Sequence, residues 1–140
     1  MTERHSIPLL GRDGETGVCF VEVLQSSPWQ VLCTGCPNYG KVSYQREFWG
    51  DDLFDILTIL RDDLERLGLT LLCMAARRDV FPSGMSRSMA GGRKAYVHRL
   101  GSPAVQGDLV DVLDTAPPHL VGTVQEQASF HESWISSLKS

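Results

Sequence analysis

The first half of the chain alternates short apolar runs with turn residues, a pattern that is typical of strands joined by tight connections. Residues 17–25, GVCFVEVLQ, and residues 29–35, WQVLCTG, are rich in β-branched and aromatic side chains. Residues 41–49, KVSYQREFW, alternate apolar and polar positions with a period near two. CPNYG at 36–40 supplies Pro, Asn and Gly for a turn. The three runs are predicted to form an antiparallel meander.

Residues 53–67 follow a helical period instead of the strand period. The apolar positions fall on one helical stripe, which consists of Leu53, Ile56, Leu57, Leu60, Leu64 and Leu67. The opposite, charged face is expected to hold Arg61, Asp62, Asp63, Glu65 and Arg66. Asp51 or Asp52 can cap the first turn, and Gly68 can end the last one.

The second half repeats these signals. LTLLCMAA at 69–76 is apolar at almost every position, which predicts a central strand covered on both faces. Residues 94–101 and 108–116 are two further strand-like runs. Thr123 with Glu126 has the spacing of a capping box at the start of a final helix. The apolar stripe of this helix is expected to comprise Val124, Ala128, His131, Ile135 and Leu138, widened by Phe130 and Trp134.

The resulting element order is β-β-β-α-β-loop-β-β-α. It predicts an α+β fold with a mostly antiparallel sheet of about five to six strands and both helices on one face. Residues 1–140 have the length of a single domain. Residues 1–16 are polar and contain Gly11 and Gly14, so they are expected to be a loosely ordered lead-in or a short edge element.

Residues 77–94, RRDVFPSGMSRSMAGGRK, interrupt the strand pattern. Ser83 is a suitable cap for a short helix from Gly84 to Met89 or Ala90, and two glycines follow it. In one interpretation, Ser83, Gly84, Arg87 and Arg93 form an anion or phosphate site, as in a small ligand-binding domain or enzyme. In the plainest interpretation, Met85 and Met89 pack on the sheet while the arginines stay in water. A protein-binding role is the third, since long irregular excursions in compact domains are often functional.

Charge is distributed unevenly along the chain. The formal net charge of the whole chain is −4, but residues 77–94 carry five basic residues and one acid, which leaves −8 for the remainder. An acidic body with one basic segment does not suit a nucleic-acid binder, which needs a broad positive face. No apolar run approaches the ~20 residues of a membrane span, and the N-terminus has no secretory signal. A cytoplasmic location is therefore expected.

Candidate chemistry is sparse. Cys33 and Cys36 form a C-x-x-C pair, but the turn and strand that follow suit neither a redox helix nor a complete zinc site. The other cysteines, Cys19 and Cys73, lie in apolar runs and are expected to be buried. The four histidines show no metal-ligand spacing; they are His5, His98, His119 and His131. No nucleophile elbow or dinucleotide glycine pattern occurs, so no catalytic residue, cofactor or metal is expected.

Four segments resemble small immunity proteins that neutralise bacterial polymorphic toxins. They are FPSGMSRSMAGG at 81–92, the Tyr96 strand, DVLD at 111–114 and the final helix from Glu126 to Trp134. The resemblance covers roughly the C-terminal half. It implies a non-enzymatic protein whose partner is a toxin domain, often a basic one if the toxin acts on nucleic acid or nucleotides.

Negative charge on the first helix would speed the capture of such a partner. The residues expected to contact the partner are Asp51, Asp52, Asp55, Asp62, Asp63, Arg78, Arg87 and Arg93. A structural homodimer is a further alternative, for which the candidate aromatic anchors are Trp29, Tyr39, Trp49 and Trp134. The sequence leaves open whether the protein is a monomer or a homodimer.

Overall fold

The computed structural model describes residues 2–37 and 44–139. Within them the chain has an α+β fold with eight strands and three α-helices. The strands are β1 (Glu3–Gly11), β2 (Thr16–Gln25), β3 (Trp29–Pro37), β4 (Tyr44–Gly50), β5 (Leu69–Leu71), β6 (Val80–Phe81), β7 (Lys94–Val97) and β8 (Leu109–Asp111). The helices are α1 (Leu53–Arg66), α2 (Gly84–Ala90) and α3 (Val124–Ser137).

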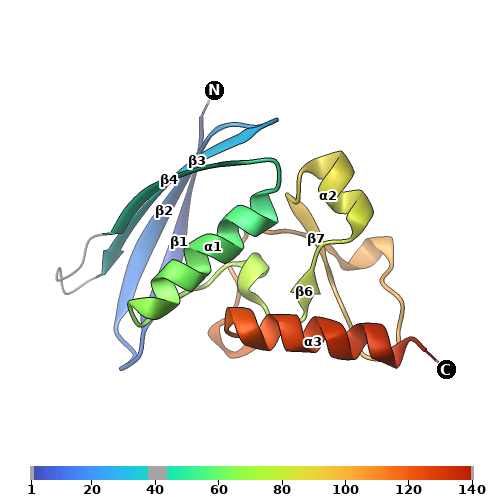
Figure 1. Ribbon diagram of the computed structural model, residues 1–140. Helices are drawn as coiled ribbons and strands as arrows, with labels where there is room; N and C mark the ends of the chain where they lie inside the picture. Colours follow the sequence, from blue (N-terminus) through green and yellow to red (C-terminus); the bar gives the residue numbers. More distant parts are fainter. Residues whose placement is uncertain (1, 38–43, 140) are drawn as a thin grey trace.

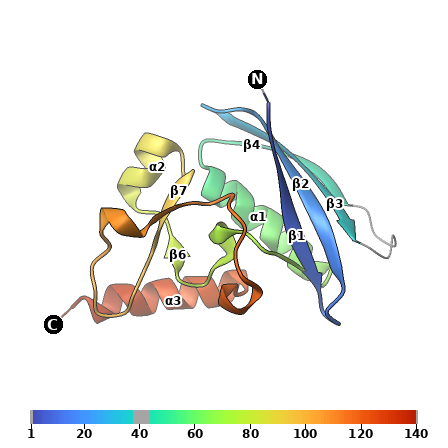
Figure 2. The same ribbon diagram turned by 180° about the vertical axis from the view of Figure 1, so that it is seen from behind.

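The strands form two antiparallel sheets rather than one. A five-stranded sheet has the order β4-β3-β2-β1-β5, and a three-stranded sheet has the order β6-β7-β8. The larger sheet curls around α1, whereas α3 packs beside β6 and the small sheet (Figure 1). Viewed from behind, the larger sheet has no helix on its outer face (Figure 2). The expectation that both helices share one face of a single sheet is therefore wrong.

The predicted meander is confirmed in the described part of the chain. β2 pairs with β3 and β3 with β4, both antiparallel, and β3 runs beyond the expected residue 35 to Pro37. The turn expected at 36–40 and the first residues of the 41–49 strand fall largely outside the described residues. Alternate residues of the meander, such as Val21, Val31 and Phe48, are buried beneath α1.

The N-terminal segment is neither of the two expected elements, a loosely ordered lead-in or a short edge element. Glu3–Gly11 form β1, which pairs with β2 on one side and with β5 on the other. Ile7 and Leu9 are buried in the core. Only these two side chains supply the apolar alternation, because Glu3 and His5, the earlier positions on the same face of the strand, are polar, and so the strand signal was weak.

The run at 69–76 is not a central strand. Only Leu69–Leu71 form β5, at the edge of the larger sheet, and Met74–Ala76 form a 3-10 turn. Cys73 makes an isolated bridge to Thr115, so the chain leaves one sheet and passes toward the other. The segment is apolar because it is buried between the two sheets. The following runs at 94–101 and 108–116 were also overextended, since β7 and β8 stop after four and three residues.

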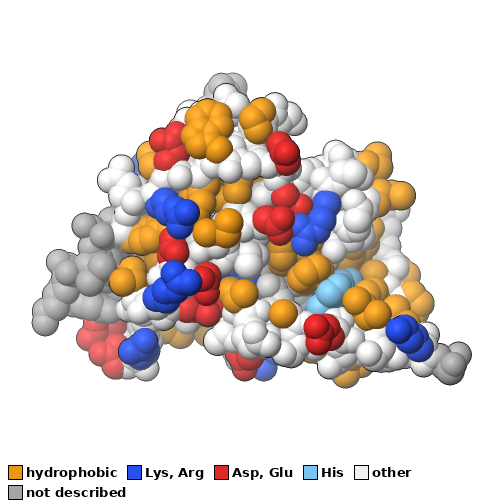
Figure 3. All heavy atoms as spheres, in the orientation of Figure 1, with side chains coloured by type: hydrophobic (Ala, Val, Ile, Leu, Met, Phe, Trp, Pro, Cys, Tyr) orange, Lys and Arg blue, Asp and Glu red, His pale blue; other side chains and the backbone are white. Residues whose placement is uncertain are grey.

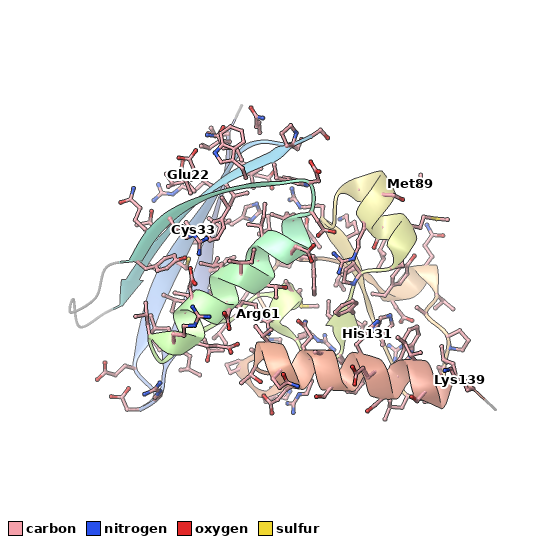
Figure 4. All side chains as sticks on the ribbon, viewed as in Figure 1. Glu22, Cys33, Arg61, Met89, His131 and Lys139 are labelled. Carbon is pink, nitrogen blue, oxygen red and sulfur yellow. The ribbon has the colours of Figure 1, made fainter. Side chains whose placement is uncertain are left out.

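The predicted first helix is confirmed except at two positions, Leu67 and Arg61. Asp52 is the N-cap and its carboxylate accepts from the Asp55 N–H, while Leu67 caps the other end and is 45% exposed. Arg61 was expected on the charged face but is buried, at 2% exposure. It lies between α1 and α3 (Figure 4).

The last helix begins as expected, but its predicted apolar stripe is only partly covered. Thr123 and Glu126 form the capping box, so the predicted start is confirmed. Ala128, Ile135 and Leu138 are exposed, and the fully buried residue is Gln127. The other expected members of the stripe are half-buried, namely Val124, Phe130, His131 and Trp134. None of the described helices has the length and apolar character needed to span a bilayer.

Candidate functional site

Helix α2 is held firmly at both ends although it has only seven residues. At its start, the Ser83 hydroxyl accepts from the Ser86 N–H and the Ser86 hydroxyl accepts from the Ser83 N–H, which completes a capping box. At its end, Gly91 adopts a left-handed conformation with φ of 58°. The Gly91 carbonyl accepts from the Leu53 N–H at 2.6 Å and from the Trp29 indole at 3.0 Å. The predicted short helix is confirmed, and it is fixed to both β3 and α1.

The side chains of α2 are oriented opposite to the plainest sequence interpretation. Arg87 points inward, where its guanidinium lies 5.6 Å from the Phe54 ring centre and 5.5 Å from that of Phe81. Met85 and Met89 point outward and are 70% and 80% exposed. Met89 extends from the outer side of the helix in Figure 4. The arginine is therefore the internal anchor of the helix, and the methionines are its free face.

Arg87 is ion-paired to the start of α1. Its Nη1 donates to Asp52 at 2.6 Å and to Asp55 at 3.0 Å. Burial alone would lower the pKa of Arg87, but the hydrogen bonds to the two carboxylates outweigh burial and raise it. The pairs and the two aromatic rings together fix α2 against α1.

Arg93 directly precedes β7 and forms a second set of ion pairs, which links the small sheet to the larger sheet. Its guanidinium donates to Asp111 of β8 at 3.0 Å and to Glu3 of β1. The hydrogen bond from Arg93, followed by that from His5, lowers the pKa of Glu3 to about 2. Both arginines of the predicted anion site are therefore occupied by carboxylates of the same chain.

The four residues of that predicted anion site do not converge. Arg87 and Arg93 line a cavity of about 800 Å³ between α2 and the loop that precedes Trp29. Ser83 and Gly84 line a different pocket, on the other side of α2. The Ser83 hydroxyl and the Ser86 N–H are also bonded to each other. The structure thus separates the components on which the phosphate interpretation depends.

The acidic residues of α1 form ion pairs rather than an open negative surface. Arg66 donates to Asp62 at 2.7 Å, and Arg46 donates to Asp63 at 2.6 Å. Burial would raise the pKa of Asp63, but hydrogen bonds from Tyr44 and Arg46 lower it overall. Acidic and basic side chains alternate over this face of the molecule (Figure 3).

Two of the residues expected to contact the partner stand apart from these pairs. Asp51 is exposed and, among the described residues, has no ion pair; it lines the cavity of about 800 Å³. Arg78 lies away from α2 and donates to the His119 carbonyl at 2.6 Å. The expected partner-binding residues therefore do not form one continuous surface.

The cysteines are structural in the described part of the chain. Cys19, Cys33 and Cys73 are buried free thiols. Burial raises the pKa of Cys33, and it raises the pKa of Cys73 to about 11, so both remain protonated. The side chain of Cys36 lies outside the described residues. No group of three metal-ligating side chains occurs in the ranges that the structure describes.

Sequence reasoning missed a pocket of about 430 Å³ that lies beside α2. Its walls come from the start of α2, from β7 and the residues after it, and from α3. The lining residues are Pro82, Ser83, Gly84, Met85, Tyr96, His98, Ala104, His131, Trp134 and Ile135. Figure 4 shows His131 on the side of α3 that faces β6.

The floor of this pocket is built from stacked rings. The His131 ring lies 3.8 Å from that of Phe81, and the His98 ring lies 3.8 Å from that of Trp134. Burial lowers the pKa of both histidines, and the neighbouring His131 lowers that of His98 further. Both imidazoles are therefore neutral near pH 7. The only sequence signal for the cluster was the i, i+3 spacing of His131 and Trp134, which had been attributed to an ordinary apolar stripe.

The site thus consists of a fixed helix with two exposed methionines, next to an aromatic pocket. No protein-family model matches the sequence, and a search of the curated proteins finds no similar protein.

Proposed function

We propose that this protein is a protein-binding module of the immunity type, which neutralises a cognate toxin by binding it and covering its active site. The observation that carries the proposal is the orientation of α2, which turns Arg87 inward and presents Met85 and Met89 to solvent. An exposed apolar pair on an anchored helix is typical of an interaction surface.

The anchoring of α2 favours binding in a second way. Its N-terminal capping box, its bonds through Gly91 and its ion pairs through Arg87 keep the helix ordered before a partner arrives. Little conformational entropy is then lost by the backbone when the complex forms. The unbranched side chains of Met85 and Met89 can still adapt to the partner, because methionine has three rotatable bonds.

The internal ion pairs change the expected role of charge. Asp52, Asp55, Asp62 and Asp63 are each paired with an arginine of the same chain, so they attract a basic partner less than their number implies. The net charge of −4 still favours a basic partner at long range. The proposal therefore places the contact with the partner on α2 and the aromatic pocket, and not on the acidic face of α1.

The experiment that tests this function is neutralisation. A protein that co-purifies with the tagged chain from its source organism is expressed alone and together with the chain. The proposal predicts that the partner alone arrests growth and that co-expression restores it in proportion to the amount of complex. A partner that is harmless alone, or whose toxicity is unchanged by the bound chain, would contradict the immunity role.

A further inference from the structure

The rings around the pocket beside α2 form two nearly parallel stacks, and the His98 and His131 planes, one from each stack, are inclined by 34° to each other. The planes of Phe81 and His131 are inclined by 15°, those of His98 and Trp134 by 16°, and those of Tyr96 and His98 by 16°. Stacked rings prefer such parallel arrangements. A flat group that enters the pocket parallel to one of these stacks can therefore extend it.

The rim of the pocket is apolar and open. Met85 of α2 and Ile135 of α3 line it and are 70% and 41% exposed, and Ala104 lines a third side. A site for a free metabolite usually buries most of its ligand. A shallow aromatic pocket with exposed apolar edges instead resembles the recess that takes one anchor side chain in a protein interface. Since Met85 also belongs to the exposed face of α2, the pocket opens within the proposed binding surface.

The chemistry of the floor favours a ring with a polar group. Nδ1 of His98 and Nδ1 of His131 are buried, and neither has a hydrogen-bond partner among the described residues. Most buried polar atoms in proteins are paired, so two unpaired nitrogens in one pocket call for an explanation. Within residues 2–37 and 44–139 neither imidazole is held by a side-chain hydrogen bond, so rotation of the His131 ring can bring a nitrogen to the pocket side. A phenol hydroxyl or an indole N–H could then pair with it.

We propose that this pocket receives a tyrosine or tryptophan side chain of the partner protein, which stacks on the ring cluster and hydrogen-bonds to a pocket histidine. The inference rests on the proposed function, because it assigns the anchor residue of the same interface. Methionine sulfur also contacts aromatic rings favourably, so Met85 at the rim suits an aromatic anchor.

The first arm of the test uses amino-acid amides as probes of the whole chain. N-acetyl-tyrosinamide, N-acetyl-phenylalaninamide and N-acetyl-leucinamide are titrated while the ¹H–¹⁵N spectrum is recorded, including the indole signal of Trp134. We expect saturable shifts at Tyr96, Met85 and Trp134, with the tyrosine probe at least about fivefold tighter than the leucine probe. Equal binding of the leucine probe, or shifts elsewhere only, would overturn the assignment.

Variants separate stacking from hydrogen bonding. Met85→Ala removes an exposed rim contact without disturbing the fold and should weaken the tyrosine probe several-fold. His131→Phe keeps a ring in place but removes its nitrogens, so it should abolish the preference for the tyrosine probe over the phenylalanine probe. A preference that survives in His131→Phe would show that this histidine is not the hydrogen-bond partner, which would overturn that part of the proposal.

The second arm uses the partner complex and distinguishes this inference from the proposed function. A pocket anchor predicts that Trp134→Leu weakens the partner complex at least tenfold. Ile135→Ser provides a second variant at an exposed rim position, should Trp134→Leu fold poorly. If the tyrosine probe binds but neither variant weakens the complex, the pocket is a small-molecule site; the anchor assignment then fails, while toxin neutralisation is unaffected.

Discussion

Arg87 of α2 donates to Asp52 at 2.6 Å, and the other carboxylate oxygen of Asp52 accepts from the Asp55 N–H at the start of α1. One carboxylate therefore caps α1 and anchors α2. β4 of the larger sheet leads into α1, and α2 leads into β7 of the small sheet, so the pair joins segments that follow one sheet and precede the other. The pair therefore contributes to the stability of the fold and also orients the proposed binding surface on α2.

Removal of the anchor should loosen α2. We expect Arg87→Met to lower the free energy of unfolding by about 1.5–3 kcal/mol, because Asp52 loses a charged hydrogen bond in a half-buried setting. Arg87→Lys should recover only part of this, since an ammonium cannot reproduce the planar contact with Phe54 and Phe81. Urea denaturation gives the energies, and amide hydrogen exchange reports on α2. Unchanged exchange in α2 of Arg87→Met would contradict its role as the anchor.

Gly92 should be intolerant of a side chain for a steric reason. Its φ is 76°, and a Cβ there would lie 2.2 Å from Asp52 Oδ1 and 3.0 Å from the Phe54 nitrogen. Gly101 is a matched control, since its φ is 79° but nothing lies within 4 Å of the added Cβ. Both alanine variants should lose about 1–2 kcal/mol through backbone strain. Gly92→Ala should lose a further 1–3 kcal/mol by overpacking, measured by urea denaturation. Equal losses would show that the contact with Asp52 relaxes freely.

Arg61 should be the most sensitive arginine of α1. It donates to the Gln127 side chain at 2.7 Å and to the carbonyls of Ala75 and Gly122 at 3.0 and 3.1 Å. Burial lowers its pKa. We expect Arg61→Met to cost about 3 kcal/mol or more, because three buried acceptors lose a charged donor.

A control for Arg61 lies on the same helix. Arg66 is exposed and pairs with Asp62 four residues earlier, so Arg66→Met should change the free energy of unfolding by less than about 0.5 kcal/mol. Chemical denaturation measures the free energy of unfolding of both variants. Similar losses in the two variants would contradict the assigned role of the Arg61 network in joining α1 to α3.

The two pocket histidines should make stability fall on mild acidification. Burial lowers the pKa of both, although Asp79 and Asp108 near His98 and Glu132 near His131 act in the opposite direction. The unfolded chain takes up protons near pH 6.5, whereas the folded chain does so only at lower pH. Stability therefore decreases as the pH falls below about 6.5. Glu3 contributes a separate loss of stability. Its pKa is lowered from 4.5 to about 2, so this loss of stability occurs only at more acidic pH.

Variants test the assignment of this pH dependence. His98→Phe combined with His131→Phe keeps both rings and should flatten the urea midpoint between pH 7.5 and 5.5. His119→Gln, at an exposed residue, should leave the slope unchanged. A slope that persists in the double phenylalanine variant would place the titrating groups elsewhere.

The elements with strong periodicity could be predicted from the sequence, and the long-range pairing could not. The meander, the α1 stripe and the caps at Ser83 and Thr123 depend on neighbouring residues, and each was correctly predicted. The division into two sheets depends on contacts between distant segments. β6 has only two residues, so it shows no period of its own.

The orientation of individual side chains was harder still. The sequence placed Arg61 with the charged residues of α1, but its partners come from Gln127 and from carbonyls of distant turns. It likewise gave no reason to expect that Arg87 would turn inward and Met89 outward. Each arrangement depends on an acceptor that is supplied by a separate part of the chain, and single-sequence periodicity does not report such acceptors.

The measurement that tests the central claim most directly is the dissociation constant of the partner complex for Met85→Glu/Met89→Glu against wild type. Ile59→Glu on α1 is the matched control, because Ile59 is also an exposed apolar residue of a helix. The account predicts at least a hundredfold weakening for the α2 variant and less than a threefold change for Ile59→Glu, with both proteins folded. Unchanged affinity in the α2 variant would show that the partner binds another face.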